Sequence, residues 1–546
     1  METTANITKI SEDIRNVVIK LGYDILGNGG TFKDVLEAGI EEIENLISLG
    51  ILTRKVVNGK VSMVEYELDD WVEKYYPILS SKVGDKTDRS YTIGTEDGGL
   101  KHKPYVKATY LFRQSQQPKS VINILRKQNR LAFKVWDRVL DFERINKSGV
   151  YDNQWQIETA TMAKAVRMVR DAKIDVYFGH QFDKRGRLYT DGYLLNYQGD
   201  EWSKAAISPI IKPQKLTKRG LLAMKIDIAN HYGFDKANYA DRVNATLPAE
   251  AKKPILASKA VEALNKAQAN NYITDYVCAI DATASGMQIL AVLANCEETA
   301  KMTNLTDISH CYDIYGNACQ KILDKTGVKD VSVKDIRDIV KKALMTRGYN
   351  SDKQVEVAAT ELKRFKIYIS ISELKDILDI SKKITSCKDA MNNLLSDTFK
   401  ELDADKQIVR YTMPDGFIVE FPNIDKAMET CACRYFSLNI KHDKLGWNHQ
   451  LNWRALSPNL VHSIDAYICR EIIKRCNFEV VTIHDSFYCH PNNIDTLRLT
   501  YIQLLKEIQQ MNMLEYIGKQ INSNFNYKPE GTPFEIAESV DSYCLC

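Results

Sequence analysis

An aspartate enclosed by two runs of strand-forming residues is the feature that most constrains this chain. Residues 480–490 read VVTIHDSFYCH, with β-branched residues before Asp485 and aromatic residues after it. Strand formers on both sides of a short polar centre predict a hairpin that carries Asp485 at or near its turn. A carboxylate this close to an apolar sheet requires compensation by a metal ion, a cation or hydrogen bonds. Taken alone, Asp485 fits a structural aspartate and a metal ligand equally well.

A second aspartate stands in a similar place. Asp281 directly follows the short apolar run VCAI and precedes a helix-like stretch. Two acids that each end a strand, although far apart in sequence, could meet in one sheet and hold a pair of divalent ions. Two-metal phosphoryl transfer requires such an arrangement, with the ions roughly 3.5–4 Å apart. The two aspartates together therefore favour a metal site over two separate structural carboxylates.

Length and composition limit what else the chain can be. With 546 residues, of which 44% are hydrophobic and 27% charged, it fits a globular enzyme of several subdomains. The net charge is only +3, so a nucleic-acid surface would need local basic patches. The twelve cysteines include no CxxC pair, which argues against a zinc site. The apolar stretch around residues 289–294 is too short to span a bilayer, and the amino terminus lacks a signal or presequence pattern. We therefore expect a cytoplasmic protein with no membrane partner.

Residues 1–104 predict a small N-terminal α+β domain and a linker. A helical pattern covers Phe32–Ser48, and alternating residues on both sides of Asn58-Gly59 predict a hairpin. A helix followed by a hairpin resembles a winged-helix module. The acidic segments EEIEN and ELDDWVEKYY favour instead a packing domain without phosphate contacts. The polar, glycine-rich residues 83–103 predict an exposed linker.

Two helical patterns follow, over residues 120–145 and 156–174. The first carries basic residues that could follow a phosphate backbone if they share one helix face. These residues are Arg126, Lys127, Arg130, Lys134 and Arg138. A solvated helix face is the more common explanation for such charges.

The segment DKRGRLY predicts a tight turn rich in guanidinium groups. Asp183, Arg185, Arg187 and Tyr189 surround Gly186. Arginines bind phosphates bidentately, and Asp183 could orient one of them. A salt-bridged surface turn explains the same pattern equally well.

The segment RDIVKKALMTRGYNS predicts a helix with side chains at steps of four residues. Arg337, Lys341, Met345 and Tyr349 wind slowly around one side of it. Lys341 and Tyr349 lie about 12 Å apart at 1.5 Å per residue, comparable to the span from the outer phosphates of a nucleotide to its sugar and base. The helix could therefore grip a nucleoside triphosphate. An amphipathic helix whose own aspartates pair with its basic residues is the alternative.

In chain order, DKRGR, DATASGMQ, RDIVKKALMTRGYNS, PNLVHSIDAY and TIHDSF resemble the single-subunit RNA polymerases of bacteriophages and mitochondria. The resemblance runs from about residue 120 to the carboxyl terminus. It implies an α+β, mostly helical right-hand polymerase with an antiparallel palm sheet. Thumb-like helices would occupy residues 105–174, the palm residues 175–308 and, with the C-terminal tail, 463–546, and the fingers residues 309–462.

The resemblance also implies roles for individual residues. Asp281 and Asp485 would be catalytic and bind two Mg²⁺ ions, with the backbone carbonyl of Ala282 as a further metal ligand. The residues implied to bind the nucleoside triphosphate are Arg337, Lys341, Tyr349, His462 and Tyr315, of which Lys341 and Tyr349 would also be catalytic. The residues implied to hold the template and the RNA–DNA hybrid are Asp183, Arg185, Arg187 and Tyr189.

Two rival functions are less consistent with the motifs. A DNA polymerase of the related A family would share the fold and both aspartates. Such enzymes carry a glutamate where Gly286 stands here, and HDE where this chain has Asp485-Ser486 after a histidine. An inactive nucleic-acid-binding subunit would have no reason to keep both aspartates together with Arg337 and Lys341.

The resemblance implies a DNA template, nascent RNA and nucleoside triphosphates as partners, and a bacterial host cytoplasm if the chain transcribes phage genes. Within the predicted fingers, RYFSLNIKHDKLGWNHQLNWRA predicts a hairpin turning near residues 443–446. The side chains available to contact base edges are Arg434, Lys441, His449, Asn452 and Arg454. A hairpin that only packs on the fingers is nearly as good an interpretation. The short, acidic region before the thumb predicts an accessory promoter-opening or single-strand-binding factor.

Overall fold

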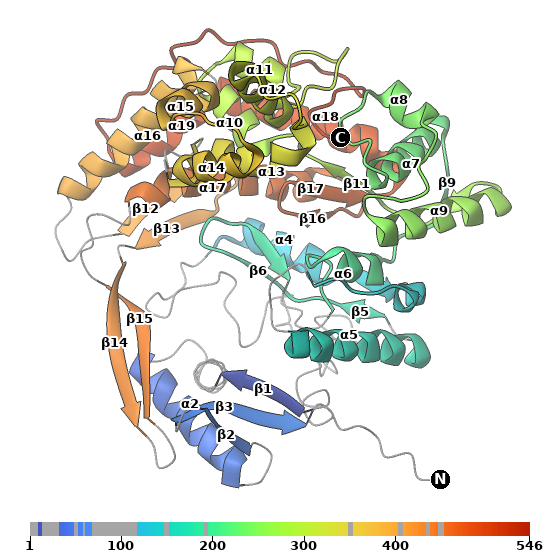
Figure 1. The fold of residues 1–546 in the computed structure, drawn as a ribbon, viewed down its shortest axis with the longest axis vertical. Coiled ribbons are helices and arrows are strands. Elements are labelled where there is room, and N and C mark those ends of the chain that lie inside the picture. Colours follow the sequence, from blue (N-terminus) through green and yellow to red (C-terminus); the bar gives the residue numbers. More distant parts are fainter. Residues whose placement is uncertain are drawn as a thin grey trace. The chain divides into compact units, whose positions relative to one another are not determined.

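The structure is a computed structural model of the 546-residue chain (Figure 1). It describes residues 9–13, 32–48, 53–57, 60–67, 117–146, 152–173, 175–190, 195–347, 353–379, 381–401, 408–422, 424–432, 437–445 and 453–546. Contacts group the chain into two compact units. Unit 1 comprises Met1–Lys184, Leu188–Ile210 and Ile424–Trp447, and unit 2 comprises Arg185–Arg187, Ile211–Asn423 and Asn448–Cys546. No described helix is long and apolar enough to cross a membrane.

Unit 1 begins with a helix and a small antiparallel sheet. Helix α2 (Phe32–Ser48) buries Leu36, Ile40 and Ile43, whose spacing places them on one face. Strands β2 (Thr53–Val57) and β3 (Lys60–Glu67) pair as the hairpin predicted around Asn58-Gly59. The sheet has a third strand that we did not predict, β1 (Lys9–Asp13), in the order β1-β3-β2. The predicted linker, residues 83–103, lies outside the described residues.

The continuous helix predicted over residues 120–145 is wrong. Helix α4 (Lys119–Asn129) ends early, and the chain continues as strand β4 (Ala132–Val135) and the 3-10 helix η1 (Asp137–Asp141). Strand β4 is the central strand of the sheet β5-β4-β8, with β5 (Val176–Tyr177) and β8 (Ile207–Pro209) on either side. Phe133 of β4 packs in the core of unit 1, 4.9 Å from Phe178 and 5.3 Å from Tyr197 between ring centroids.

Because this segment is not one continuous helix, the predicted basic helix face does not form. Lys134 lies in the strand and Arg138 in the 3-10 helix, so the five basic residues do not share one helix. The second predicted helix is present as α5 (Asp152–Ala172). Unit 1 further contains the hairpin of β6 (His180–Phe182) and β7 (Leu188–Thr190), and the short helix α6 (Glu201–Ala206).

The hairpin predicted to turn near residues 443–446 is wrong, because residues 437–445 form one strand that pairs with an upstream segment. Strand β14 (Ile424–Ala432) pairs with β15 (Ser437–Leu445) over their full lengths, and Ala432 is opposite Ser437. The connection therefore spans residues 433–436, and residues 443–445 lie at the far end of β15. Of the residues proposed to contact bases, Lys441 lies in β15 and Arg454 is the second residue of the next helix, whereas Arg434, His449 and Asn452 lie outside the described residues.

The core of unit 2 is a three-stranded antiparallel sheet in the order β11-β17-β16 (Figure 1). Its strands are β11 (Cys278–Asp281), β16 (Val481–Ile483) and β17 (Ser486–Cys489), and β16 and β17 form the predicted hairpin. On the other edge of β11, Ala282 forms an isolated antiparallel bridge with Leu545. Helices α10 (Ser285–Leu293), α17 (Trp453–Arg475) and α18 (Ile494–Gln510) pack on one another beside this sheet.

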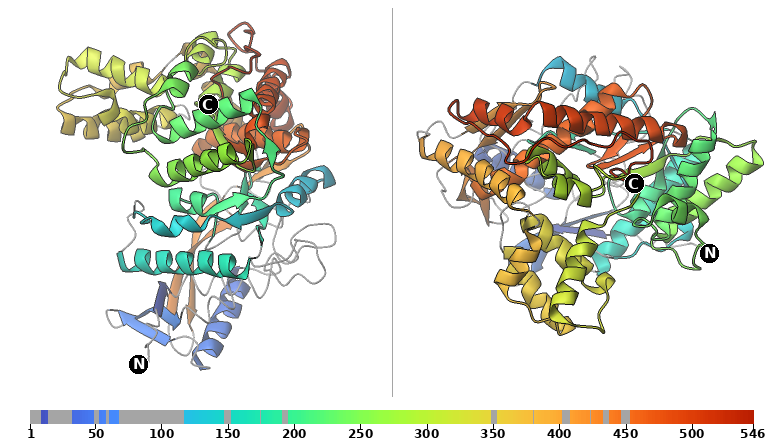
Figure 2. Two further views of the ribbon diagram at one scale, coloured as in Figure 1. Left: turned by 90° about the vertical axis from the view of Figure 1, so that its right-hand side faces the viewer. Right: turned by 90° about the horizontal axis from the view of Figure 1, so that it is seen from above.

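The remaining elements of unit 2 are mostly helices, and α12 to α15 form a group of their own, drawn in yellow tones in both panels of Figure 2. The helices are α7 (Lys218–His231), α8 (Tyr239–Asn244), α9 (Pro254–Ala269), α11 (Glu297–Met302), α12 (Ile314–Thr326), α13 (Val333–Arg347), α14 (Lys353–Leu362), η2 (Lys363–Phe365), α15 (Ile371–Leu378), α16 (Lys382–Glu401), η3 (Pro491–Asn493) and α19 (Met513–Ile521). The short strands are β9 (Gln214–Lys215), β10 (Ile273–Thr274), β12 (Ile408–Thr412) and β13 (Ile418–Pro422). The chain is thus mostly helical with small antiparallel sheets, as predicted.

Candidate active site

Sheet pairing brings the two strand-end aspartates together in unit 2. Asp281 is the last residue of β11 and lies opposite Ser486, so Asp485 in the β16–β17 turn is its diagonal neighbour. The backbone N–H of Ala282 donates to the carbonyl oxygen of Asp485 at 3.1 Å. His484, the other turn residue, has a positive φ of 55°. Two acids far apart in sequence therefore meet where their strands end.

The electrostatics of this pair suit a bound cation. Burial, together with the charges of Asp465 and Asp281, raises the pKa of Asp485 to about 7. Uncompensated carboxylates at close range are costly, and a divalent cation would remove that cost. Carboxylate and backbone carbonyl oxygens are the donors that Mg²⁺ prefers. Asp281, Asp485 and the Ala282 carbonyl therefore fit such an ion, although the described residues contain no cluster of three metal-binding side chains.

A third carboxylate, Asp465, lies beside this pair. It belongs to α17 and is only 5% exposed. Its Oδ2 accepts a hydrogen bond from Arg187 at 2.9 Å, and its Oδ1 accepts one from the Ser285 hydroxyl at 2.6 Å. We did not identify Asp465 from sequence. The available signal was an acid in an otherwise apolar helix, three residues after His462.

The DKRGR segment forms the predicted tight turn between β6 and β7. Gly186 has a φ of 86°, and its carbonyl oxygen accepts a hydrogen bond from the Arg470 guanidinium at 2.9 Å. Arg470 is almost fully buried, forms an ion pair with Asp415 and lies 4.4 Å from the centre of the Phe417 ring. The turn is therefore fixed through its backbone by a buried ion pair.

The two arginines of this turn contact helix α17. Arg187 pairs with Asp465, and Nη1 of Arg185 lies 3.1 Å from Nδ1 of His462. Burial, with the neighbouring charges of Arg187 and Arg185, lowers the pKa of His462 to about 3, so its imidazole is neutral near pH 7. The structure thus pairs Arg187 with Asp465 and Arg185 with His462, both on α17.

The other two residues of the predicted turn motif are in unit 1. Asp183, buried, and Tyr189, partly buried, flank Arg185–Arg187 in the chain. Their predicted contact with template and hybrid remains a prediction.

The predicted nucleotide helix is present as α13, and its cations surround one tyrosine. Arg337 forms two hydrogen bonds of 3.0 Å with the carboxylate of Asp313, the N-cap residue of α12. The Tyr315 ring lies 5.5 Å from the Arg337 guanidinium and 5.4 Å from the Lys341 ammonium. Tyr315, Arg337 and Lys341 are thus brought together. Tyr349 lies outside the described residues.

A buried asparagine connects this cluster to the strand that carries Asp281. Asn304, fully buried, donates from Nδ2 to the Tyr312 carbonyl at 3.0 Å and to the Thr283 hydroxyl at 3.3 Å. Its Oδ1 accepts a hydrogen bond from the Tyr312 backbone N–H at 2.7 Å. Tyr312 directly precedes Asp313, and Thr283 follows Asp281 by two residues. Neither Asn304 nor Asp313 was predicted from its sequence neighbourhood.

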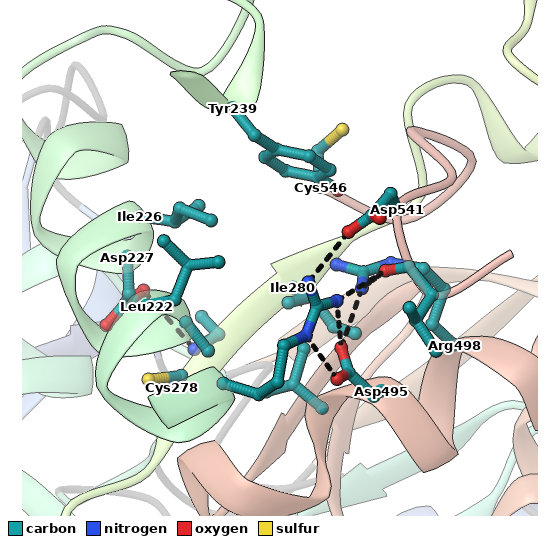
Figure 3. A pocket seen from close by; sticks show the side chains of 15 residues that line it. Leu222, Ile226, Asp227, Tyr239, Cys278, Ile280, Asp495, Arg498, Asp541 and Cys546 are labelled. Carbon is teal, nitrogen blue, oxygen red and sulfur yellow. Dashed lines mark hydrogen bonds and ion pairs between the residues drawn. The ribbon is translucent and has the colours of Figure 1, made fainter. Parts of the chain in front are cut away.

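A small pocket in unit 2 is a poor alternative site (Figure 3). It is lined by α7, β11, α18 and the C-terminal segment, and its volume is about 40 Å³. Such a volume holds a few water molecules and excludes a nucleotide. Its charged groups pair with one another, as Arg219 does with Asp495 and Asp541. The described lining residues include neither Asp281 nor Asp485.

Comparisons with a family profile and with individual proteins identify the same family. The sequence profile described as DNA-dependent RNA polymerase matches residues 255–540, just over half of the chain. A probable DNA-directed RNA polymerase of Gelasinospora sp. is 24% identical over 453 residues, 71% of this chain and 53% of the relative. The mitochondrial DNA-directed RNA polymerase 1 of Arabidopsis thaliana is 23% identical, with 67% of this chain and 43% of the relative covered. The mitochondrial enzyme of Schizosaccharomyces pombe is 21% identical, with 64% and 35% covered.

The chain therefore spans about half the length, or less, of these relatives. Those names that state a compartment give the mitochondrion or the chloroplast. The comparisons thus lend no support to a bacterial host cytoplasm or to bacteriophage genes as the template.

Proposed function

This chain belongs to the family of single-subunit DNA-dependent RNA polymerases, and we propose that it adds nucleoside monophosphates from nucleoside triphosphates to the 3′ end of an RNA on a DNA template. The observation that carries this proposal is that Asp281, the last residue of β11, lies next to Asp485 in the β16–β17 turn. Two of the relatives are named as mitochondrial polymerases, which is a precedent for an organellar DNA template. Transcription of phage genes is supported only by the motif resemblance.

Two Mg²⁺ ions are the proposed cofactor. The carboxylates of Asp281 and Asp485 and the carbonyl of Ala282 would hold them, and the ions would acidify the RNA 3′ hydroxyl and neutralise phosphate charge. In support of this, burial and the neighbouring acids oppose ionisation of Asp485 when no cation is present. The protein's own part is to keep both carboxylates in place, which the sheet register does through the backbone rather than through flexible side chains.

The cations of α13 are proposed to bind the triphosphate. Lys341 and Arg337 lie one helical turn apart on α13, so their charges fall on the same side. Asp313 holds Arg337 in a bidentate pair, which preorganises the guanidinium at the cost of part of its charge. Preorganised positive charge stabilises the negative charge that develops on the phosphates during transfer.

Sugar selection is proposed to depend on Tyr349 and His462. Gly286, near the start of α10, presents no side chain that could exclude a ribose hydroxyl. The neutral imidazole of His462 can both donate and accept a hydrogen bond, and its contact with Arg185 fixes the ring. The role of Tyr349 in sugar selection is proposed from the motif resemblance alone.

Extension of a labelled RNA primer annealed to a DNA template tests the proposal. We expect the purified chain to add ribonucleotides in the order set by the template, and to require Mg²⁺. A preference for deoxyribonucleotides would indicate a DNA polymerase. Binding of the hybrid without any extension, under conditions where Mg²⁺ is saturating, would indicate an inactive nucleic-acid-binding subunit.

A further inference from the structure

Asp465 joins three parts of unit 2 that are remote in sequence. It lies in α17, its partner Arg187 lies in the turn after β6, and its partner Ser285 begins α10, the helix that follows Asp281. The side chain of Asp465 is 6% exposed and that of Arg187 is 18% exposed. A buried carboxylate is tolerated when it is paired and hydrogen-bonded, and both conditions are met here.

Asp465 is poorly placed to be a metal ligand itself. Each of its carboxylate oxygens already accepts a hydrogen bond, one from Arg187 and one from Ser285. A metal ion would have to share one of these oxygens with its donor, beside the positive charge of Arg187. Asp465 therefore differs from Asp281, which is exposed, and from Asp485, which is only partly buried by its solvent-accessible surface.

The bond to Asp465 determines where the Arg187 guanidinium can lie. The arginine side chain is long and can adopt many rotamers, and a charge-assisted hydrogen bond to a buried acceptor restricts most of this freedom. The guanidinium held in this way is linked through Asp465 to Ser285, four residues after Asp281. A guanidinium carries five N–H donors in a planar fork and can bind more than one acceptor at a time.

We propose that Asp465 is a positioning residue that acts through Arg187, holding the guanidinium beside the Asp281–Asp485 pair so that it binds a phosphate of the RNA–DNA hybrid. This inference rests on the proposed polymerase function. The resemblance already implies that Arg187 contacts the hybrid, and the new assignment is the role of Asp465, which orients the guanidinium for that contact. Asp465 contacts no substrate in this arrangement.

A double-mutant cycle on hybrid affinity tests the inference. Asp465→Asn keeps the shape of the side chain and an oxygen for Ser285, but removes the charge that holds Arg187. We expect the Kd for a pre-annealed RNA–DNA hybrid, measured by fluorescence anisotropy at fixed salt, to rise about tenfold, because hydrogen bonds to charged groups have this order of effect. In the R187Q background, D465N should change Kd by less than about twofold.

Several outcomes separate positioning from a purely structural role. If D465N raises Kd by the same factor in both backgrounds, Asp465 does not act through Arg187 and the inference is wrong. Asp465→Glu, which restores the charge, should recover part of the lost affinity. If D465N does not fold, the cycle is repeated with D465E and R187K, which keep both charges and alter only the geometry. Coupling in that cycle supports the inference, and additivity overturns it.

A matched control is available elsewhere in unit 2. Asp495→Asn weakens another arginine–aspartate pair, in which Arg219 retains Asp541, and it should leave hybrid affinity within about twofold of wild type. The polymerase proposal and the inference about Asp465 can fail independently. The polymerase proposal is wrong if wild-type protein binds the hybrid but does not extend it. The cycle on Kd is still measurable in that case.

Discussion

The turn that carries Arg185 and Arg187 allows a sharp comparison between two glycines. Gly186 and Gly327 both have positive φ, 86° and 68° respectively. A Cβ at residue 186 would overlap the Arg470 guanidinium and lie 3.1 Å from Phe417, whereas a Cβ at residue 327 would meet nothing within 4 Å. Alanine at either position bears the cost of a left-handed backbone, but only alanine at residue 186 must also move Arg470.

The expected magnitudes follow from these environments. The left-handed conformation costs about 1–2 kcal/mol for a residue with a Cβ. The side chains of Arg470 and Asp415 are 1% and 2% exposed, so separating them leaves a buried charge without its partner. Breaking such a pair costs about 3–5 kcal/mol. We therefore expect Gly327→Ala to lower the free energy of unfolding by about 1–2 kcal/mol, and Gly186→Ala to lower it by several kcal/mol more.

Equilibrium urea unfolding of both variants beside wild type measures this difference, and the Kd for the RNA–DNA hybrid gives a second readout. Gly186→Ala should weaken hybrid binding, because the backbone that carries Arg185 and Arg187 is displaced. Gly327→Ala, in the loop after α12, should not. Equal losses of stability in the two variants would show that Arg470 yields without cost and that the turn is not fixed by the buried pair.

Three further predictions concern the site itself. Asp281→Asn or Asp485→Asn should lower the single-turnover rate of nucleotide addition by several orders of magnitude while hybrid Kd stays nearly unchanged, and wild-type rates in either variant would refute the metal assignment. Tyr349→Phe should reduce the preference for ribo- over deoxyribonucleotides about tenfold in kcat/KM, since one hydrogen bond to the 2′ hydroxyl is lost, and an unchanged ratio would place discrimination elsewhere. In EDTA the free energy of unfolding should fall as pH rises from the ordinary carboxyl pKa near 3.8 to about 7, because native Asp485 retains a proton that the unfolded chain has released. Asp485→Asn should lack that component, and identical pH dependence of the variant and wild type would contradict it.

The sequence was most informative where a pattern is local. Strand formers around Asp485, the apolar run before Asp281, and the spacing of α13 each depend on neighbours a few residues away. The structure has the hairpin, the strand and the helix at those places. The meeting of the two aspartates could also be predicted, because each stands at the end of a strand.

Pairing between remote segments was not predictable in the same way. Residues 132–135 have a composition compatible with a helix, and they form a strand because β5 and β8 flank them and Phe133 fills the core of unit 1. The hairpin predicted over residues 434–454 was wrong because residues 443–446 include turn-forming residues, whereas the partner of β15 is the upstream strand β14. Asp465 was missed because its partners, Arg187 and Ser285, are brought to it only by the folded chain.

The order of the strands in the β11-β17-β16 sheet has a consequence during protein synthesis. The ribosome completes β11 about 200 residues before it reaches β17. At about 5–20 residues per second, the newly made strand waits some 10–40 s for its neighbour. Helices α12 to α15 emerge in that interval and contact mainly one another, so they can fold ahead of the sheet. An unpaired apolar strand exposed for this long is a target for chaperones and for misassociation with other nascent chains.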